Sequence, residues 1–303
     1  MFKIFADLAD TQSFSKAAET NGITQSAVSQ QIRAVEKNFQ ITLIERGRRD
    51  FALTNEGRAF LEASREILEI YESLGNRLQK MRDVVAGDLR ISTVYSIGLH
   101  ELPPYLKQFR RTYPEVEVKV EYRRSAQVYN AVLEGSADVG LVAYPSPRRG
   151  LDVLTFWKDK LVVICAPSHR FAHRRRLKLR DLDGEKFIAF EPDLPTRKEI
   201  DRRFKDEGVK VRHALEFDNI ETVKRSVEIE NGISIVPETA VQAEIRSGSL
   251  IAVEIDAENM WRPLGALIKK RLSGSHARKK FLDMLEKTNM GAVDSQSFPR
   301  KNS

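Results

Sequence analysis

A group of polar side chains near the N-terminus has the types and spacing that would suit contacts with nucleic-acid bases. The spacing of the apolar residues Val28, Ile32, Val35 and Phe39 predicts a helix with one buried stripe. The opposite face carries hydroxyl, amide and guanidinium groups, which bond to base edges and phosphates. The candidate DNA contacts on and beside this helix are Thr24, Gln25, Ser26, Ser29, Gln30 and Arg33.

Three arginines follow this helix on a predicted hairpin-like wing. They are Arg46, Arg48 and Arg49. Guanidinium groups on a wing suit phosphate oxygens or a narrow minor groove. Acidic and basic residues are nearly balanced in this part of the chain, although the net charge of all 303 residues is +7. DNA binding would therefore depend on placed charges and not on a bulk basic tail.

The elements before this helix decide between two interpretations of its polar face. An ordinary solvated helix would also expose Ser and Gln. Here "SKAAETNGI" predicts a short helix with two small residues, Ala17 and Ala18, followed by a tight turn at Gly22. A short helix, a glycine turn and a second helix form a helix-turn-helix, which favours DNA binding.

A long helix is predicted to follow, from about residue 55 to residue 84. Thr54 is a suitable N-cap. Apolar residues recur every seven positions along this helix and leave a seam that nothing adjacent in the sequence covers. We therefore expect a second copy of the helix to cover it, although the seam would also suit packing on the chain's own domains. The predicted dimerisation residues are Phe60, Ile67, Tyr71, Leu74, Leu78 and Met81.

The chain from residue 87 to about residue 290 alternates between strand and helix patterns. This alternation predicts parallel sheets covered by helices, and its length favours two lobes with a cleft between them. The predicted fold class is α/β with an all-α N-terminal part. The predicted lobe 1 spans about 87–160 and 265–290, lobe 2 spans about 161–264, and residues 291–303 are expected to be a disordered tail.

Composition excludes several other classes. No run of 18 apolar residues exists and the first residues do not resemble a secretory signal, so we expect a cytoplasmic protein. Cys165 is the only cysteine and lies in an apolar run, which predicts a buried, inert thiol. The usual hydrolase, nucleotide-binding and zinc-protease motifs are missing, and arginines follow His169 and His173. We therefore expect no enzyme activity, no metal and no cofactor.

The chain resembles the LysR-type transcriptional regulators over roughly residues 1–290. The resemblance rests on "FSKAAETNGITQSAVSQQI", the wing entry "LIER" and the start of the linker helix, "LTNEG". It implies a winged helix-turn-helix domain (residues 1–54), a linker helix (55–86) and a two-lobed effector domain similar to periplasmic binding proteins (87–290). It also implies regulation of transcription on double-stranded DNA as a homodimer or homotetramer. The family favours Gly at the position of Gln40, where a left-handed Gln would cost about 1 kcal/mol.

The resemblance also implies a small-molecule effector between the lobes. Matching the family's cleft positions indicates that the effector-binding residues are Ser96, Ser125, Tyr144, Thr196 and Asn219. Free N–H groups at helix starts suit an anionic effector, and Arg197 would add charge. Each Ser, Thr or Asn would equally serve as a helix cap. The alternatives are a DNA-binding architectural protein without a ligand and, less favoured, a solute-binding protein.

Overall fold

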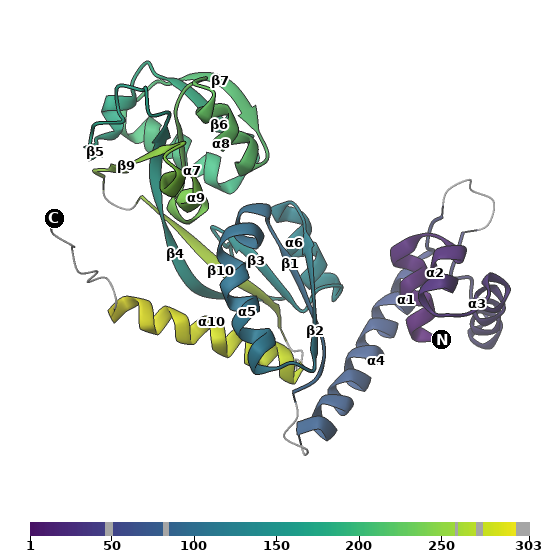
Figure 1. The fold of residues 1–303 in the computed structure, drawn as a ribbon. Coiled ribbons are helices and arrows are strands. Elements are labelled where there is room, and N and C mark those ends of the chain that lie inside the picture. Colours follow the sequence, from purple (N-terminus) through teal and green to yellow (C-terminus); the bar gives the residue numbers. More distant parts are fainter. Residues whose placement is uncertain (46–50, 81–84, 258–259, 271–274, 295–303) are drawn as a thin grey trace. The chain divides into compact units, whose positions relative to one another are not determined.

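The computed structural model describes residues 1–45, 51–80, 85–257, 260–270 and 275–294 (Figure 1). Two compact units make up the chain, residues 1–84 and residues 85–303. Arg46, Arg48, Arg49 and Met81 lie outside the described residues. No helix of the described part is long and apolar enough to cross a membrane.

The first unit is helical. Its helices are α1 (Phe2–Thr11), α2 (Phe14–Thr20), α3 (Gln25–Phe39) and α4 (Asn55–Lys80). An isolated antiparallel bridge joins Ile44 to Leu53 between α3 and α4. Apolar residues of all three N-terminal helices meet in one core, to which the start of α4 contributes Phe60 and Leu61.

The predicted helix-turn-helix is confirmed. Gly22, with φ +64°, adopts the left-handed conformation that favours glycine and turns the chain between α2 and α3. The Oγ1 of Thr24 then accepts a hydrogen bond from the backbone N–H of Ala27 at 3.2 Å and caps α3. Thr54 caps α4 in the same way, since its Oγ1 accepts from the N–H of Gly57 at 2.9 Å.

The apolar stripe of α3 is one residue shorter than predicted. Val28, Ile32 and Val35 are buried, but Phe39 is 56% exposed. Phe39 is the last residue of the helix, and the next residue, Gln40, has φ 56° and turns the chain away. Part of its ring still packs against Phe60, with ring centroids 6.0 Å apart.

The second unit has two lobes that share two long strands. In lobe 1 the strand order is β2-β1-β3-β10-β4, and in lobe 2 the second half of β4 pairs with β8 and β9. The strands are β1 (Gly87–Thr93), β2 (Val116–Tyr122), β3 (Val139–Ala143), β4 (Leu151–Cys165), β5 (Arg176–Leu177), β6 (Lys186–Phe190), β7 (Arg212–Phe217), β8 (Ser234–Pro237), β9 (Ile251–Ile255) and β10 (Trp261–Lys269). Figure 1 shows β4 and β10 running side by side between the lobes.

The alternating pattern predicts parallel sheets, but the larger sheet of the second unit is mixed. Strands β1, β2 and β3 are parallel, but β10 is antiparallel to both β3 and β4, and β4 is antiparallel to β8 and β9. Residues 151–165 form one continuous strand of 15 residues, β4. The antiparallel pairs arise because β4 leads from lobe 1 into lobe 2 and β10 leads back along it.

Helices cover both faces of each lobe. The helices of the second unit are α5 (Leu102–Thr112), α6 (Ser125–Glu134), α7 (Pro195–Glu207), α8 (Ile220–Glu228), α9 (Gln242–Ser247) and α10 (His276–Asp294). In lobe 1, α5 and α10 share a core on one face of the sheet and α6 packs on the other. In lobe 2, α7 and α8 belong to separate cores on the two faces. Cys165 is buried, and burial raises the pKa of its thiol to about 11.

Candidate DNA-binding face and ligand cavity

One exposed face of α3 carries the predicted base-reading residues. Ser26, Gln30 and Arg33 are exposed and Ser29 is half-buried. Their spacing of three and four residues places them on one side of the helix, opposite the buried stripe. Thr24 differs from them because its Oγ1 caps the helix and lies 2.9 Å from the Oγ of Ser26. The N–H groups at this helix start suit a phosphate oxygen.

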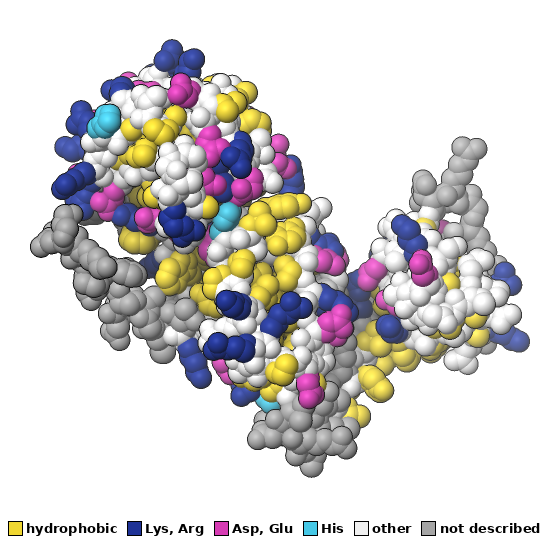
Figure 2. Space-filling view, viewed as in Figure 1, with side chains coloured by type: hydrophobic (Ala, Val, Ile, Leu, Met, Phe, Trp, Pro, Cys, Tyr) yellow, Lys and Arg dark blue, Asp and Glu magenta, His cyan; other side chains and the backbone are white. Residues whose placement is uncertain are grey.

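Apolar side chains are exposed along α4. Ile67 is 40% exposed, Ile70 69%, Tyr71 75% and Leu74 52%, and Figure 2 shows some of this hydrophobic surface. The side chain of Leu78 lies outside what the structure describes. Phe60 is different from the other predicted dimerisation residues, because it packs edge-on against Phe5 in the core of the first unit, 5.1 Å between centroids.

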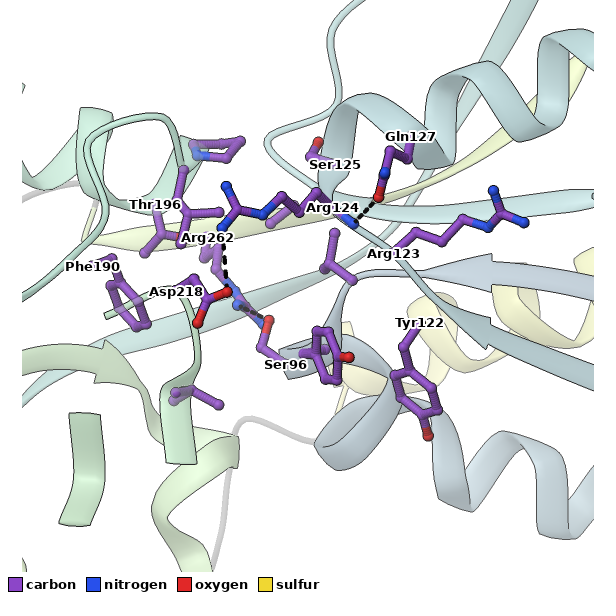
Figure 3. Close-up of a pocket in the computed structure, with 16 residues that line it drawn as sticks. Ser96, Tyr122, Arg123, Arg124, Ser125, Gln127, Phe190, Thr196, Asp218 and Arg262 are labelled. Carbon is purple, nitrogen blue, oxygen red and sulfur yellow. Dashed lines mark hydrogen bonds and ion pairs between the residues drawn. The ribbon is translucent and has the colours of Figure 1, made fainter. Parts of the chain in front are cut away.

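A cavity of about 350 Å³ lies between the two lobes (Figure 3). Loops at the carboxyl ends of β1, β2 and β6 and the starts of α6, α7 and α8 surround it, as expected for ligand sites in open α/β sheets. Among the predicted effector-binding residues, Ser96, Ser125 and Thr196 line this cavity. Tyr95 and Tyr122 also line it and stack on one another, with centroids 5.3 Å apart.

Two predicted effector-binding residues do not line the cavity. One is Tyr144, whose backbone N–H donates to the carbonyl of Pro263 at 2.8 Å. Burial raises the pKa of the Tyr144 phenol. The Oδ1 of Asn219 accepts from the N–H of Glu221 at 2.8 Å and caps α8. Arg197 is also turned away, since its buried guanidinium bonds to Asp201, to Glu216 and to the carbonyl of Phe190.

Two helix starts, one from each lobe, reach the cavity. Ser125 is the first residue of α6, and Thr196 is the second residue of α7, after Pro195. At the start of α6 the Oε1 of Gln127 accepts from the N–H of Arg124 at 3.2 Å. Among the described residues, no side chain caps the next N–H groups of α6 or the first N–H groups of α7, so these groups and the positive ends of the helices remain available to an anion. Thr196 is only 8% exposed, and its hydroxyl has no hydrogen-bond partner among the described residues.

A buried arginine, Arg262 on β10, forms the base of the cavity. Its guanidinium is 2% exposed and donates to the Oγ of Ser96 at 3.0 Å and to Glu101 at 2.5 Å. Ser96 therefore accepts from Arg262 and keeps its own proton for a ligand. Asp159, 3.6 Å from Arg262, supplies a second carboxylate.

The carboxyl group of Glu101 is buried beside Arg262. Burial raises its pKa to about 8, although Arg262 acts in the opposite direction. The hydroxyl of Thr239, from lobe 2, lies 3.0 Å from Glu101 Oε1 and 2.5 Å from Asp159 Oδ2.

Arg124 lies at the mouth of the cavity and is surrounded by carboxylates of lobe 2. Its guanidinium lies 2.9 Å from Glu191, 3.3 Å from Asp218 and 3.4 Å from Asp193. Arg124 and Arg262 are not among the residues predicted from the sequence, although "RRS" directly before a helix at the end of β2 is a usable signal for Arg124.

The structure thus combines a helix-turn-helix with a two-lobed α/β unit that holds a ligand-sized cavity, the architecture of a ligand-responsive DNA-binding protein. Residues 1–58 match the family model described as the bacterial regulatory helix-turn-helix protein of the lysR family, and residues 82–289 match the LysR substrate binding domain. The chain belongs to the LysR family of transcriptional regulators.

Individual relatives agree with this assignment. The regulator CysL of Bacillus subtilis is 24% identical over 94% of this chain and 96% of its own length. A full-length OxyR variant from Pseudomonas aeruginosa has a similar fold, with a TM-score of 0.78, 18% identity and coverage of 98% and 97% of the two chains. The regulatory domain of Synechocystis CcmR, solved in complex with 2-PG, is 25% identical with a TM-score of 0.61 and covers 67% of this chain and 97% of its own.

The chain is therefore a DNA-binding transcriptional regulator that acts on double-stranded DNA as a homo-oligomer and carries an effector-binding domain. Neither alternative considered above, an architectural protein without a ligand or a solute-binding protein, gains support from these matches.

Proposed function

We propose that α3 reads base edges in the major groove while the wing arginines hold the DNA backbone. The amides of Gln25 and Gln30 suit bidentate bonds to adenine, and Ser26 and Ser29 suit base edges or phosphates. Arg33 supplies a guanidinium on the same exposed face. Arg46, Arg48 and Arg49 are assigned to phosphates or the minor groove from the sequence alone.

We further propose that the effector is a small anion whose charged group lies between the starts of α6 and α7. Thr196 carries this proposal, because this largely buried residue lines the cavity and its hydroxyl has no partner among the described residues. Ser125 contributes the matching hydroxyl from lobe 1. The hydroxyl of Ser96, at the bottom of the cavity, donates a hydrogen bond to the anion. The complex of CcmR with 2-PG supports a small-molecule ligand for this type of domain.

A thermal shift experiment on the full-length protein tests the anionic effector. Small dicarboxylates such as succinate are compared with their neutral diamides. We expect the acids to raise Tm and the diamides to leave it unchanged, because only an anion gains from the positive ends of two helices. Ser125→Ala and Thr196→Val should reduce the shift, whereas Thr112→Val at the end of α5 should not. Stabilisation by the diamides alone would contradict the proposal.

The homo-oligomer is proposed to form through α4. Its exposed apolar residues Ile67, Ile70, Tyr71 and Leu74 lie within about two turns of each other and suit a second copy of the same helix. We assign the protein to the cytoplasm, where its DNA target lies, and to regulation without a catalytic step or a cofactor.

A further inference from the structure

The ion pairs of Arg124 all cross from one lobe to the other. Arg124 precedes α6 in lobe 1, whereas Glu191 and Asp193 precede α7 and Asp218 precedes α8 in lobe 2. Nitrogen-to-oxygen distances are 2.9, 3.4 and 3.3 Å, respectively. One side chain thus ties the start of α6 to the loops before α7 and α8.

The same guanidinium lies beside the place proposed for the anion. Arg124 is the residue directly before Ser125, and Figure 3 shows its side chain extending over the cavity toward Thr196 and Asp218. A ligand anion between the starts of α6 and α7 would therefore lie next to a cation that already has partners.

The ion pairs of Arg124 are exposed and weak, so a ligand anion can replace the present partners of the guanidinium. Three carboxylates surround one guanidinium, which leaves an excess of negative charge at the mouth of the cavity. Arg124 is 51% exposed, and ion pairs between exposed side chains contribute little stability. A ligand anion would interact with the positive ends of α6 and α7 as well as with Arg124. The carboxylates of lobe 2 do not have this additional interaction.

On the basis of the anionic effector proposed above, we propose that Arg124 is a ligand-responsive latch between the lobes. Without ligand, Arg124 holds the lobes together through Glu191, Asp193 and Asp218. The anionic group of the effector replaces these carboxylates as the partner of Arg124. The released carboxylates then face the bound anion and repel it, so ligand binding changes how the lobes are held.

The neighbouring arginine provides a matched control. Arg123 also lines the cavity, but its guanidinium bonds to Glu121 of its own lobe at 2.6 Å. In Figure 3 its side chain points away from that of Arg124. The two residues share charge and sequence context and differ in whether they connect the lobes.

Ligand affinity of the full-length protein tests the exchange. Succinate binding is measured by calorimetry for the wild type, Arg124→Gln, Arg123→Gln and a triple variant with Glu191→Gln, Asp193→Asn and Asp218→Asn. We expect Arg124→Gln to weaken binding at least tenfold, Arg123→Gln to change it less than twofold, and the triple variant to bind at least threefold tighter. Equal or weaker binding by the triple variant, or equal losses in both arginine variants, would overturn the latch.

Hydrogen exchange without ligand tests the latch independently of the effector's identity. In Arg124→Gln, peptides covering residues 189–197 and 215–222 should exchange faster than in the wild type, and in Arg123→Gln they should not. Unchanged exchange in Arg124→Gln overturns the latch. Faster exchange together with no binding of succinate or inorganic phosphate by the wild type would refute the proposed anionic effector and leave the latch supported.

Discussion

At the scale of single residues, the two kinds of DNA contact should be separable. Gln30 is exposed on α3 and is proposed to read a base, whereas Arg48 is assigned to the backbone from the sequence. We expect Gln30→Ala to reduce discrimination between cognate and random duplexes by about 1–3 kcal/mol, the value of one bidentate base contact. Arg48→Ala should weaken binding to all sequences alike and flatten its salt dependence. Fluorescence anisotropy at two salt concentrations measures both effects.

An equal effect of both substitutions would contradict this division. If Gln30→Ala also weakened random and cognate duplexes alike, the exposed face of α3 would position the protein and would not read sequence. The cognate duplex can be sought in the intergenic DNA beside the protein's own gene, with a scrambled duplex as control.

The residues around the cavity differ in whether their roles could be predicted from the sequence. Ser125 and Thr196 were predicted from the family's cleft positions, and each lies at the start of a helix, a feature that is local in the sequence. Arg124 and Arg262 could not be paired from sequence, because their partners lie 67 to 161 residues away. Only the folded lobes bring these charges together. For Asn219, which was assigned to the cavity on the same resemblance, the structure favours the alternative of a helix cap.

At the scale of elements, α4 should control assembly. Leu74 is 52% exposed among other apolar residues of α4. Leu74→Glu would lose apolar burial and place a charge in the proposed helix pair, so the dimer should dissociate at concentrations at least tenfold higher than the wild type. Sedimentation velocity measures this change. Glu62→Lys, a charge change at an exposed position of α4, should leave assembly intact, and an unchanged Leu74→Glu oligomer would exclude this face as the interface.

The elements also show where local patterns are sufficient. The cap at Thr54 and the turn at Gly22 follow from residue type, and the structure confirms both. Pattern alone could not reveal that β4 is a single strand shared by both lobes, nor that β10 returns antiparallel to it. Strand direction depends on partners distant in sequence, and an alternating pattern is the same in parallel and antiparallel strands.

At the scale of the whole molecule, a buried polar network connects the two lobes. Glu101 belongs to lobe 1 and Thr239 to lobe 2, while Asp159 and Arg262 lie on the long strands β4 and β10 that run between them. Since Arg262 also donates to Ser96, this network extends to the base of the ligand cavity. The protonation of Glu101 therefore affects the stability of the whole effector-binding unit.

The free energy of unfolding of the protein should fall as the pH rises from about 4.5 to about 8. Burial raises the pKa of Glu101 to about 8, above its ordinary value of 4.5, so folding favours the protonated carboxyl. The unfolded chain loses this proton near pH 4.5, and stability is therefore lost between about pH 4.5 and pH 8. Glu101→Gln, which mimics the neutral carboxyl, should flatten the dependence of Tm on pH in this range. Glu117→Gln, at an exposed position, should leave the slope as in the wild type, and an unchanged slope in Glu101→Gln would show that Glu101 is ionised in the folded protein.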